Sequence, residues 1–169
     1  MSTIVSELEF GPSLQLVSAV PARPSPRWQP ARPLLWIDGA RRPTEVLHAF
    51  ERSGGVWTGV EVERMLQRRT AQPISLLARW IVDSLVVSVA WRGDYLLPAF
   101  QFDVTNASVR RPVFDVLEAL GGTLKDLDLA AWFARPNDRL DGVAPVDAID
   151  HDPEAVVDAA HAERRAGRG

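Results

Sequence analysis

Residues 132–149, WFARPNDRLDGVAPVDAI, begin with two large aromatic side chains that directly precede a turn. Pro136 lacks a backbone N–H and favours the end of a helix, whereas Gly142 allows a backbone with positive φ. Pro145 suits the first turn of a new helix. The stretch therefore predicts a packed corner between two helices, with the aromatic pair as a hydrophobic plug under the turn.

The residues that follow the aromatic pair have spacings that fit such a corner. We expect Leu140 to return to the core, and Val146 and Ile149 to close over the aromatic side chains. No catalytic motif requires two aromatics before a proline turn, so the stretch favours a structural role. The same reasoning predicts that Trp132 is buried rather than exposed.

Helical periodicity surrounds this corner on both sides. Apolar side chains repeat at helical spacing in residues 112–120 and again in 123–137, where Thr123 is expected to cap the second helix. A last helix is expected after Asp152, which suits an N-cap and precedes a proline. Residues 108–169 are therefore predicted to form a small helical bundle.

Within a predicted module of residues 34–107, residues 58–102 predict two helices followed by a β-hairpin. Thr58 and Glu61 have the spacing of a capping box, and apolar spacing predicts the second helix within residues 74–84. The period then changes to two on both sides of residues 92–94, which is a hairpin signal. This order resembles a small winged helix-turn-helix, as in excisionase-type DNA-binding modules, whose second helix enters the major groove. The expected fold class is α+β and mainly helical: a helix-turn-helix with a β-hairpin wing, then the bundle.

DNA contact by this module requires basic and polar side chains in the turn, on the second helix and at the hairpin. The candidate DNA-binding residues are Arg68, Arg69, Gln72, Ser75, Arg79 and Arg92. Residues 51–95 carry six arginines against five acidic residues, however, whereas DNA-binding surfaces are usually much more basic. A purely structural role, or dimerisation, is the alternative, and we expect a homo-oligomer.

Three further features of residues 1–107 also predict local structure. Residues 1–33 include PARPSPRWQPARP and are predicted to form a disordered tail or linker. Residues 43–55 predict a helix that ends at Gly54-Gly55. Pro98 predicts that its strand lies at a sheet edge or ends there.

The corner motif also resembles a known family. Its residues are Trp132, Phe133, Pro136, Asn137, Leu140, Gly142 and Pro145. With the helices around it, over about residues 112–165, the motif is similar to the C-terminal toxin-binding domain of Xre/MbcA/ParS-type antitoxins. The resemblance implies a protein that binds and neutralises a RES-domain toxin, an enzyme that consumes NAD, and is compatible with repression of its own operon. The alternatives are a DNA-binding transcription regulator without a toxin partner and a non-enzymatic adaptor.

The composition of the chain bears on whether it is an enzyme, a metal-binding protein or a membrane protein. The 169 residues contain no cysteine, and the three histidines lack the spacing of a helical metal pair, so we expect no metal, no cofactor and no enzyme activity. The sequence has no apolar run of about 18 residues and no signal-like N-terminus, which predicts a cytoplasmic protein without a membrane span. Residues 115–169 carry twelve acidic and six basic side chains. The negative charge favours a basic protein surface over nucleic acid as the binding partner of this part of the chain. A helix face exposed to solvent explains the charge equally well.

Overall fold

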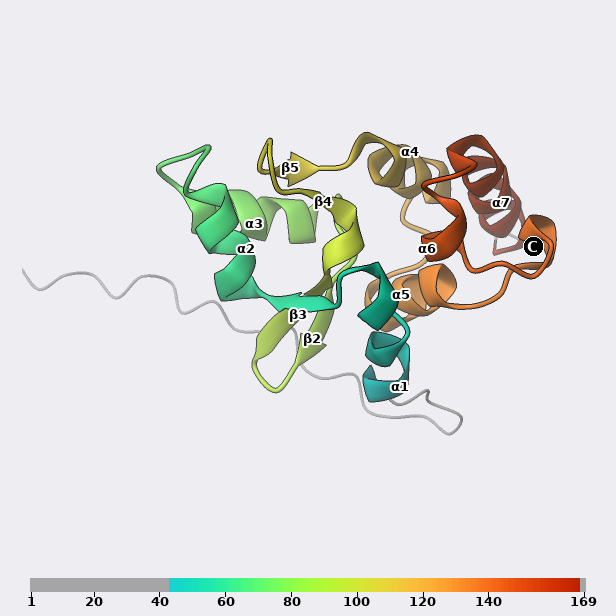
Figure 1. The fold of residues 1–169 in the computed structure, drawn as a ribbon, viewed down its shortest axis with the longest axis horizontal. Coiled ribbons are helices and arrows are strands. Elements are labelled where there is room, and N and C mark those ends of the chain that lie inside the picture. Colours follow the sequence, from blue (N-terminus) through green and yellow to red (C-terminus); the bar gives the residue numbers. More distant parts are fainter. Residues whose placement is uncertain (1–42, 168–169) are drawn as a thin grey trace, which may run out of the picture.

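The computed structural model describes residues 43–167, which form an α+β structure that is mainly helical (Figure 1). The helices are α1 (Pro43–His48), α2 (Gly59–Leu66), α3 (Pro73–Val82), α4 (Arg111–Leu120), α5 (Asp126–Ala134), α6 (Pro145–Ala148) and α7 (Pro153–Ala166), with 3-10 helices η1 (Glu51–Ser53), η2 (Ala99–Gln101) and η3 (Asp138–Leu140). The strands are β1 (Val56–Thr58), β2 (Val89–Trp91), β3 (Asp94–Pro98), β4 (Phe102–Asp103) and β5 (Ser108–Val109). The predicted Pro-rich tail lies outside the described residues.

A three-stranded antiparallel sheet lies at the centre of the N-terminal half, in the order β1-β3-β2. The predicted hairpin is confirmed, since Arg92 and Gly93 form a two-residue turn in which both residues have positive φ (51° and 88°), as tight hairpins require. Pro98 is the last residue of β3, which is the central strand, so its predicted role as a strand end is confirmed and the sheet-edge alternative is wrong. The sequence did not predict β1, β4 or β5, because these strands have only two or three residues and lie outside the longer alternating stretches around Arg92-Gly93 that indicated β2 and β3.

Helices α2 and α3 pack over a small hydrophobic core that includes Val62, Leu66, Leu77 and Trp80. The predicted capping box at the start of α2 is present: Glu61 N donates to Thr58 Oγ1, and Thr58 N donates to the Glu61 carboxylate at 2.7 Å. The hydrogen bonds that the Glu61 carboxylate accepts from Thr58 N and from Thr58 Oγ1 hold the pKa of this carboxyl below its usual value. The local signals in the sequence therefore define this helix correctly.

A larger hydrophobic core joins the two halves of the chain. Phe50 stacks on Phe100 with ring centroids 5.6 Å apart, and Phe100 contacts Phe133 of α5 at 5.2 Å. The same core continues through α4, α5 and α7, and Figure 1 shows α1 beside α5. Residues on both sides of the predicted boundary at 107/108 therefore share one core.

Gln101 is a fully buried polar side chain at the junction between the halves. Its Oε1 accepts a hydrogen bond from Val87 N at 2.7 Å, and its Nε2 donates to Val87 O and Pro98 O, each at 2.9 Å. Arg110 N donates to the Gln101 backbone oxygen at 2.8 Å, and the Arg110 guanidinium pairs with Asp150. The amide therefore satisfies three backbone groups where the sheet meets the helical half.

Two predicted helices differ from the structure at their ends. The helix expected over residues 123–137 spans Asp126–Ala134, and Thr123 is not its cap, because Thr123 Oγ1 donates to Leu120 O within the preceding turn. The helix expected over 43–55 ends at His48 and continues as a 3-10 turn, with Gly54 at φ 100°. No helix within residues 43–167 is long and apolar enough to cross a membrane.

Candidate protein-binding site

The corner after α5 is built on a buried aromatic pair. Trp132 is 5% exposed, Phe133 is fully buried, and their rings meet edge to face with centroids 5.0 Å apart. Leu140, Val146 and Ile149 are buried in the same core. The predicted plug under the turn is therefore confirmed, and Pro145 is the first residue of α6 as expected.

Asn137 holds the turn together through four hydrogen bonds. Its backbone N–H donates to Val143 O at 3.1 Å, and its backbone oxygen accepts from Leu140 N at 2.9 Å and Gly142 N at 3.0 Å. Its side-chain oxygen accepts from Arg139 N at 3.0 Å and caps η3. An asparagine at this position therefore closes residues 137–143 into a compact loop that fixes the direction in which α6 leaves α5.

Two consecutive residues of this loop have left-handed backbones, namely Asp141 (φ 54°) and Gly142 (φ 80°). The predicted positive φ at Gly142 is confirmed, and a Cβ on Gly142 would meet no atom within 4 Å. We expect Gly142→Ala to lower the free energy of unfolding by about 1–2 kcal/mol, because an L side chain disfavours this backbone even where space is free. Urea unfolding measures the effect.

Asp141→Gly is the matched control for that substitution. It changes the neighbouring left-handed residue in the opposite direction, so the free energy of unfolding should stay unchanged or rise slightly. A Gly142→Ala variant as stable as the wild type would contradict the view that backbone conformation selects glycine here.

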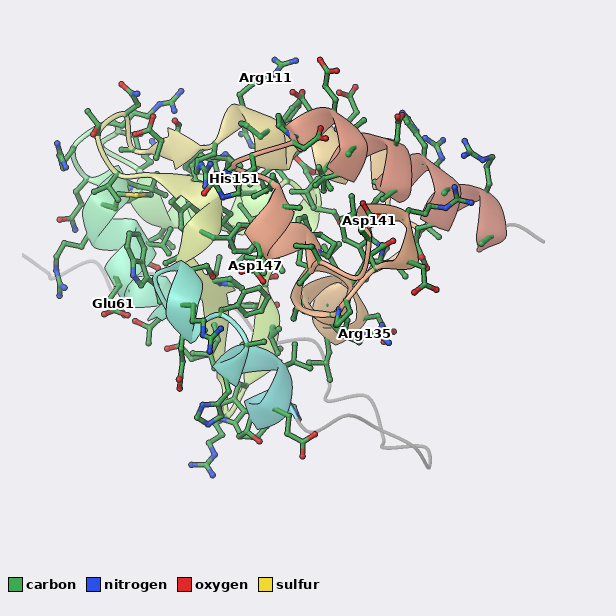
Figure 2. All side chains as sticks on the ribbon, turned by 45° about the vertical axis from the view of Figure 1, so that its right-hand side comes forward. Glu61, Arg111, Arg135, Asp141, Asp147 and His151 are labelled. Carbon is green, nitrogen blue, oxygen red and sulfur yellow. The ribbon has the colours of Figure 1, made fainter. Side chains whose placement is uncertain are left out.

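A groove runs between this corner and helix α7. One cavity of about 450 Å³ has walls from the corner, including Trp132, Pro136 and Asn137, and a floor from α7 that includes Ala159 and Ala162. A second cavity of about 390 Å³ continues along α7 and shares Arg139 and Ala159 with the first. We call the two cavities together the α7 groove. Figure 2 shows Arg135 and Asp141 on the α5–α6 connection, beneath α7.

The charged side chains that line the α7 groove are balanced. They are Arg135, Arg139 and Arg165 with Asp138, Asp158 and Glu163. The groove is therefore neutral in charge within an acidic half of the chain. Mixed charges above a floor of alanine suit a polypeptide surface better than a phosphate or a single ion. Within residues 43–167, no group of three or more His, Asp or Glu side chains is placed to hold a metal ion.

No family model, curated protein or solved structure matches this chain. Its function must therefore be inferred from the arrangement of its own residues.

Five of the six candidate DNA-binding residues lie on or beside α2 and α3, which Figure 1 shows at the opposite end of the molecule from α7, whereas the sixth lies in the β2–β3 turn, and β2 contacts α5. The six residues are Arg68, Arg69, Gln72, Ser75, Arg79 and Arg92, and all are exposed. Arg68 donates to Val104 O at 3.2 Å, and Arg92 lies over the Trp91 ring at 5.4 Å. These two cations therefore already have contacts within the chain.

Helix α3 also presents apolar side chains that the sequence analysis did not assign. Ile74 is 66% exposed and Val82 is 78% exposed, and they lie two turns apart on one side of the helix. Single exposed apolar side chains are common on protein surfaces, so these two do not by themselves mark a binding site. They do make the helix that would enter a DNA groove less polar than DNA recognition usually requires.

Sequence reasoning also missed the floor of the α7 groove. Ala155, Ala159, Ala162 and Ala166 line it, and their spacing alternates between four and three residues. That spacing is visible in the sequence and is typical of a helix–helix contact. Alanine gives a weak hydrophobic signal, however, so attention to large apolar residues overlooked it.

Proposed function

We propose that this chain is an antitoxin-like, non-enzymatic binding protein that holds a RES-domain toxin, an NAD-consuming enzyme, through its C-terminal helices. The observation that carries the proposal is the corner itself. The motif residues that resemble the antitoxin domain form one compact unit, in which Asn137 closes the loop and Trp132 and Phe133 fill the space beneath it.

An exposed apolar side chain next to this loop gives the proposal a specific contact. Val143 is 44% exposed, although its backbone is held by hydrogen bonds to Asn137 and Leu140. A rigid, partly exposed apolar group of this kind suits the centre of a protein interface, because little conformational freedom is lost on binding. The acidic C-terminal part then favours a partner with basic groups around that contact.

Co-expression with a RES-domain toxin encoded beside this gene tests the proposal. We expect the wild-type chain to restore growth of cells that express the toxin, and to co-purify with it. Val143→Asp should weaken both effects without lowering the thermal stability of the free chain. Val60→Asp is the matched control, since Val60 is an exposed valine (57%) on α2, far from the corner. Failure of the wild type to bind or rescue would contradict the proposal.

A second candidate function is that of a DNA-binding regulator, either of its own operon or without a toxin. The observation in its favour is that two helices, α2 and α3, precede the β2–β3 hairpin, which is the order expected of a helix-turn-helix with a β-hairpin wing. The six exposed candidate residues support it, whereas the apolar side chains on α3 count against it.

An electrophoretic shift experiment with the DNA upstream of the gene, repeated over a salt series, tests this second function. A regulator should bind at low salt and lose affinity steeply as salt increases, because bound cations displace counterions from phosphate. No shift at low salt would contradict DNA binding. A shift with no salt dependence would contradict a contact made through arginines and phosphate.

A further inference from the structure

The first cavity of the α7 groove, of about 450 Å³, is lined by a buried side chain whose hydrogen-bond donor has no acceptor. The donor is the indole Nε1 of Trp132, which finds no partner among residues 43–167 although the side chain is only 5% exposed. A buried N–H without an acceptor costs free energy, and few remain in folded proteins. Because the hydrophobic core encloses the rest of the ring, an acceptor from another molecule can reach this N–H only through the cavity.

Asn137 and Arg139 bring further donors to the same cavity. The Asn137 side-chain oxygen accepts from Arg139 N at 3.0 Å, which fixes the orientation of the amide and leaves its Nδ2 to act as a donor. Neither this Nδ2 nor the Arg139 guanidinium bonds to another residue in the described part of the chain. Three kinds of donor therefore line one cavity and lack acceptors within residues 43–167.

The acidic side chains of the cavity indicate which kind of acceptor fits. Asp138 and Glu163 line it together with Arg135 and Arg139, so the charges balance. A carboxylate or phosphate ligand would meet two carboxylates of like charge, whereas a neutral oxygen meets no such repulsion. A peptide group carries a neutral carbonyl acceptor, and also an N–H that a carboxylate can accept. The cavity therefore suits the backbone of a polypeptide.

The backbone that enters must be extended and not already bonded within its own protein. The carbonyls of a helix or of an inner strand are used by that helix or sheet, whereas an extended segment keeps its carbonyls available. The second cavity, of about 390 Å³, continues along α7 and gives room for further residues of such a segment. An extended chain advances by about 3.3 Å per residue, so it can follow both cavities.

The cavity is continuous with the contact proposed above. Asn137, which lines the cavity, donates from its backbone N–H to the oxygen of Val143, the exposed apolar residue at the other end of the same loop. A partner that covers Val143 therefore borders the cavity.

We propose that the α7 groove binds an extended segment of the partner protein, one of whose backbone carbonyls accepts a hydrogen bond from Trp132 Nε1. This inference rests on the proposed function, because it names how the toxin contacts the C-terminal helices. Nε1 is buried in the free chain, so binding requires a small shift of the cavity wall. The exposed side chain of Arg139 is the part of the wall that moves, as side chains at interfaces commonly do on binding.

The indole N–H signal of Trp132 in the full-length chain reports this bond directly. The chain has six tryptophans, and the indole signal that Trp132→Phe removes from a nitrogen–proton NMR spectrum belongs to Trp132. Addition of the unlabelled RES-domain toxin encoded beside this gene should move the signal to lower field, because the N–H gains an acceptor. The indole signals of Trp57 and Trp80, which pack in the smaller core, should stay in place.

Calorimetric titration with the same toxin separates the donors from the fold. Trp132→Phe keeps a ring in the core and should weaken binding roughly threefold to tenfold, since one toxin carbonyl loses its donor. Asn137→Asp keeps the oxygen that caps η3 but replaces the donor with a carboxylate, so binding should weaken roughly tenfold or more, with little change in Tm. Arg139→Gln should weaken binding about threefold, whereas its matched control Arg52→Gln, on η1 and outside the groove, should not.

The outcomes distinguish this contact from the proposed function. A wild-type chain that does not bind the toxin contradicts the proposed function and the contact with it. If the toxin binds while the Trp132 signal stays in place and the variants bind like the wild type, the function stands and the contact is overturned. A signal that already has its low-field position in the free chain also overturns it, because the acceptor is then a bound water or another part of the chain.

Discussion

Replacement of Gln101 by leucine is expected to lower the free energy of unfolding by about 3–5 kcal/mol. The leucine fills a similar volume but cannot hydrogen-bond, so Val87 N, Val87 O and Pro98 O lose their partner inside the protein. Each buried polar group left without a partner costs about 1–3 kcal/mol. The side chain is fully buried, and water cannot take the place of the lost bonds without opening the junction.

Thermal unfolding followed by circular dichroism measures this effect, with an expected fall in Tm of about 10 °C or more. Gln67→Leu is the matched control, because Gln67 is an exposed glutamine at the end of α2. Its replacement should change the stability by no more than about 0.5 kcal/mol. A Gln101→Leu variant with the Tm of the wild type would show that the amide does not hold the junction.

Trp132→Ala should have a comparable effect, with an expected loss of about 3–5 kcal/mol, as large aromatic truncations in cores produce. Trp132 is almost fully buried and meets Phe133 edge to face, so the truncation leaves a cavity beneath the corner. We expect stability and partner binding to be lost together. A folded variant with an unchanged Tm would contradict the role of this side chain as the plug of the corner.

Trp132→Phe distinguishes the contribution of the aromatic ring to stability from that of the indole N–H. Among the described residues, the indole Nε1 is the one buried side-chain nitrogen or oxygen without a hydrogen-bond partner. Phenylalanine keeps an aromatic ring and removes the unpaired N–H, whose burial carries its own cost. The phenylalanine variant should therefore lose much less stability than the alanine variant. Equal losses in urea unfolding would show that the N–H finds an acceptor in solution.

The parts of the fold that follow from nearby residues could be predicted from the sequence. The capping box of Thr58 and Glu61, the turn at Arg92-Gly93 and the positive φ at Gly142 each depend on a few neighbouring side chains. The same holds for the burial of Trp132 and Phe133, because proline and glycine after them set the geometry of the turn. Interactions between neighbouring residues were therefore sufficient to predict most of the helices and the corner after α5.

The parts that depend on distant residues could not be predicted in this way. Strand β1 is only three residues long and acquires its hydrogen bonds from β3, across two intervening helices. Gln101 looks like an ordinary surface residue until the loop at Val87 is folded against it. The α7 groove exists only because η3 packs beside α7. Its alanines show their spacing in the sequence but not the surface that they face.

The row of phenylalanines from Phe50 through Phe100 to Phe133 has a consequence for how this chain can be rearranged during evolution. Genes often recombine as modules, and a module that folds alone keeps its apolar side chains covered after transfer. Here a fragment that begins at residue 108 would leave Phe133 without the rings that cover it, and the preceding fragment would leave Phe100 uncovered in the same way. The two halves are therefore expected to be inherited together, and fusion to other proteins is expected at the ends of the chain rather than between them.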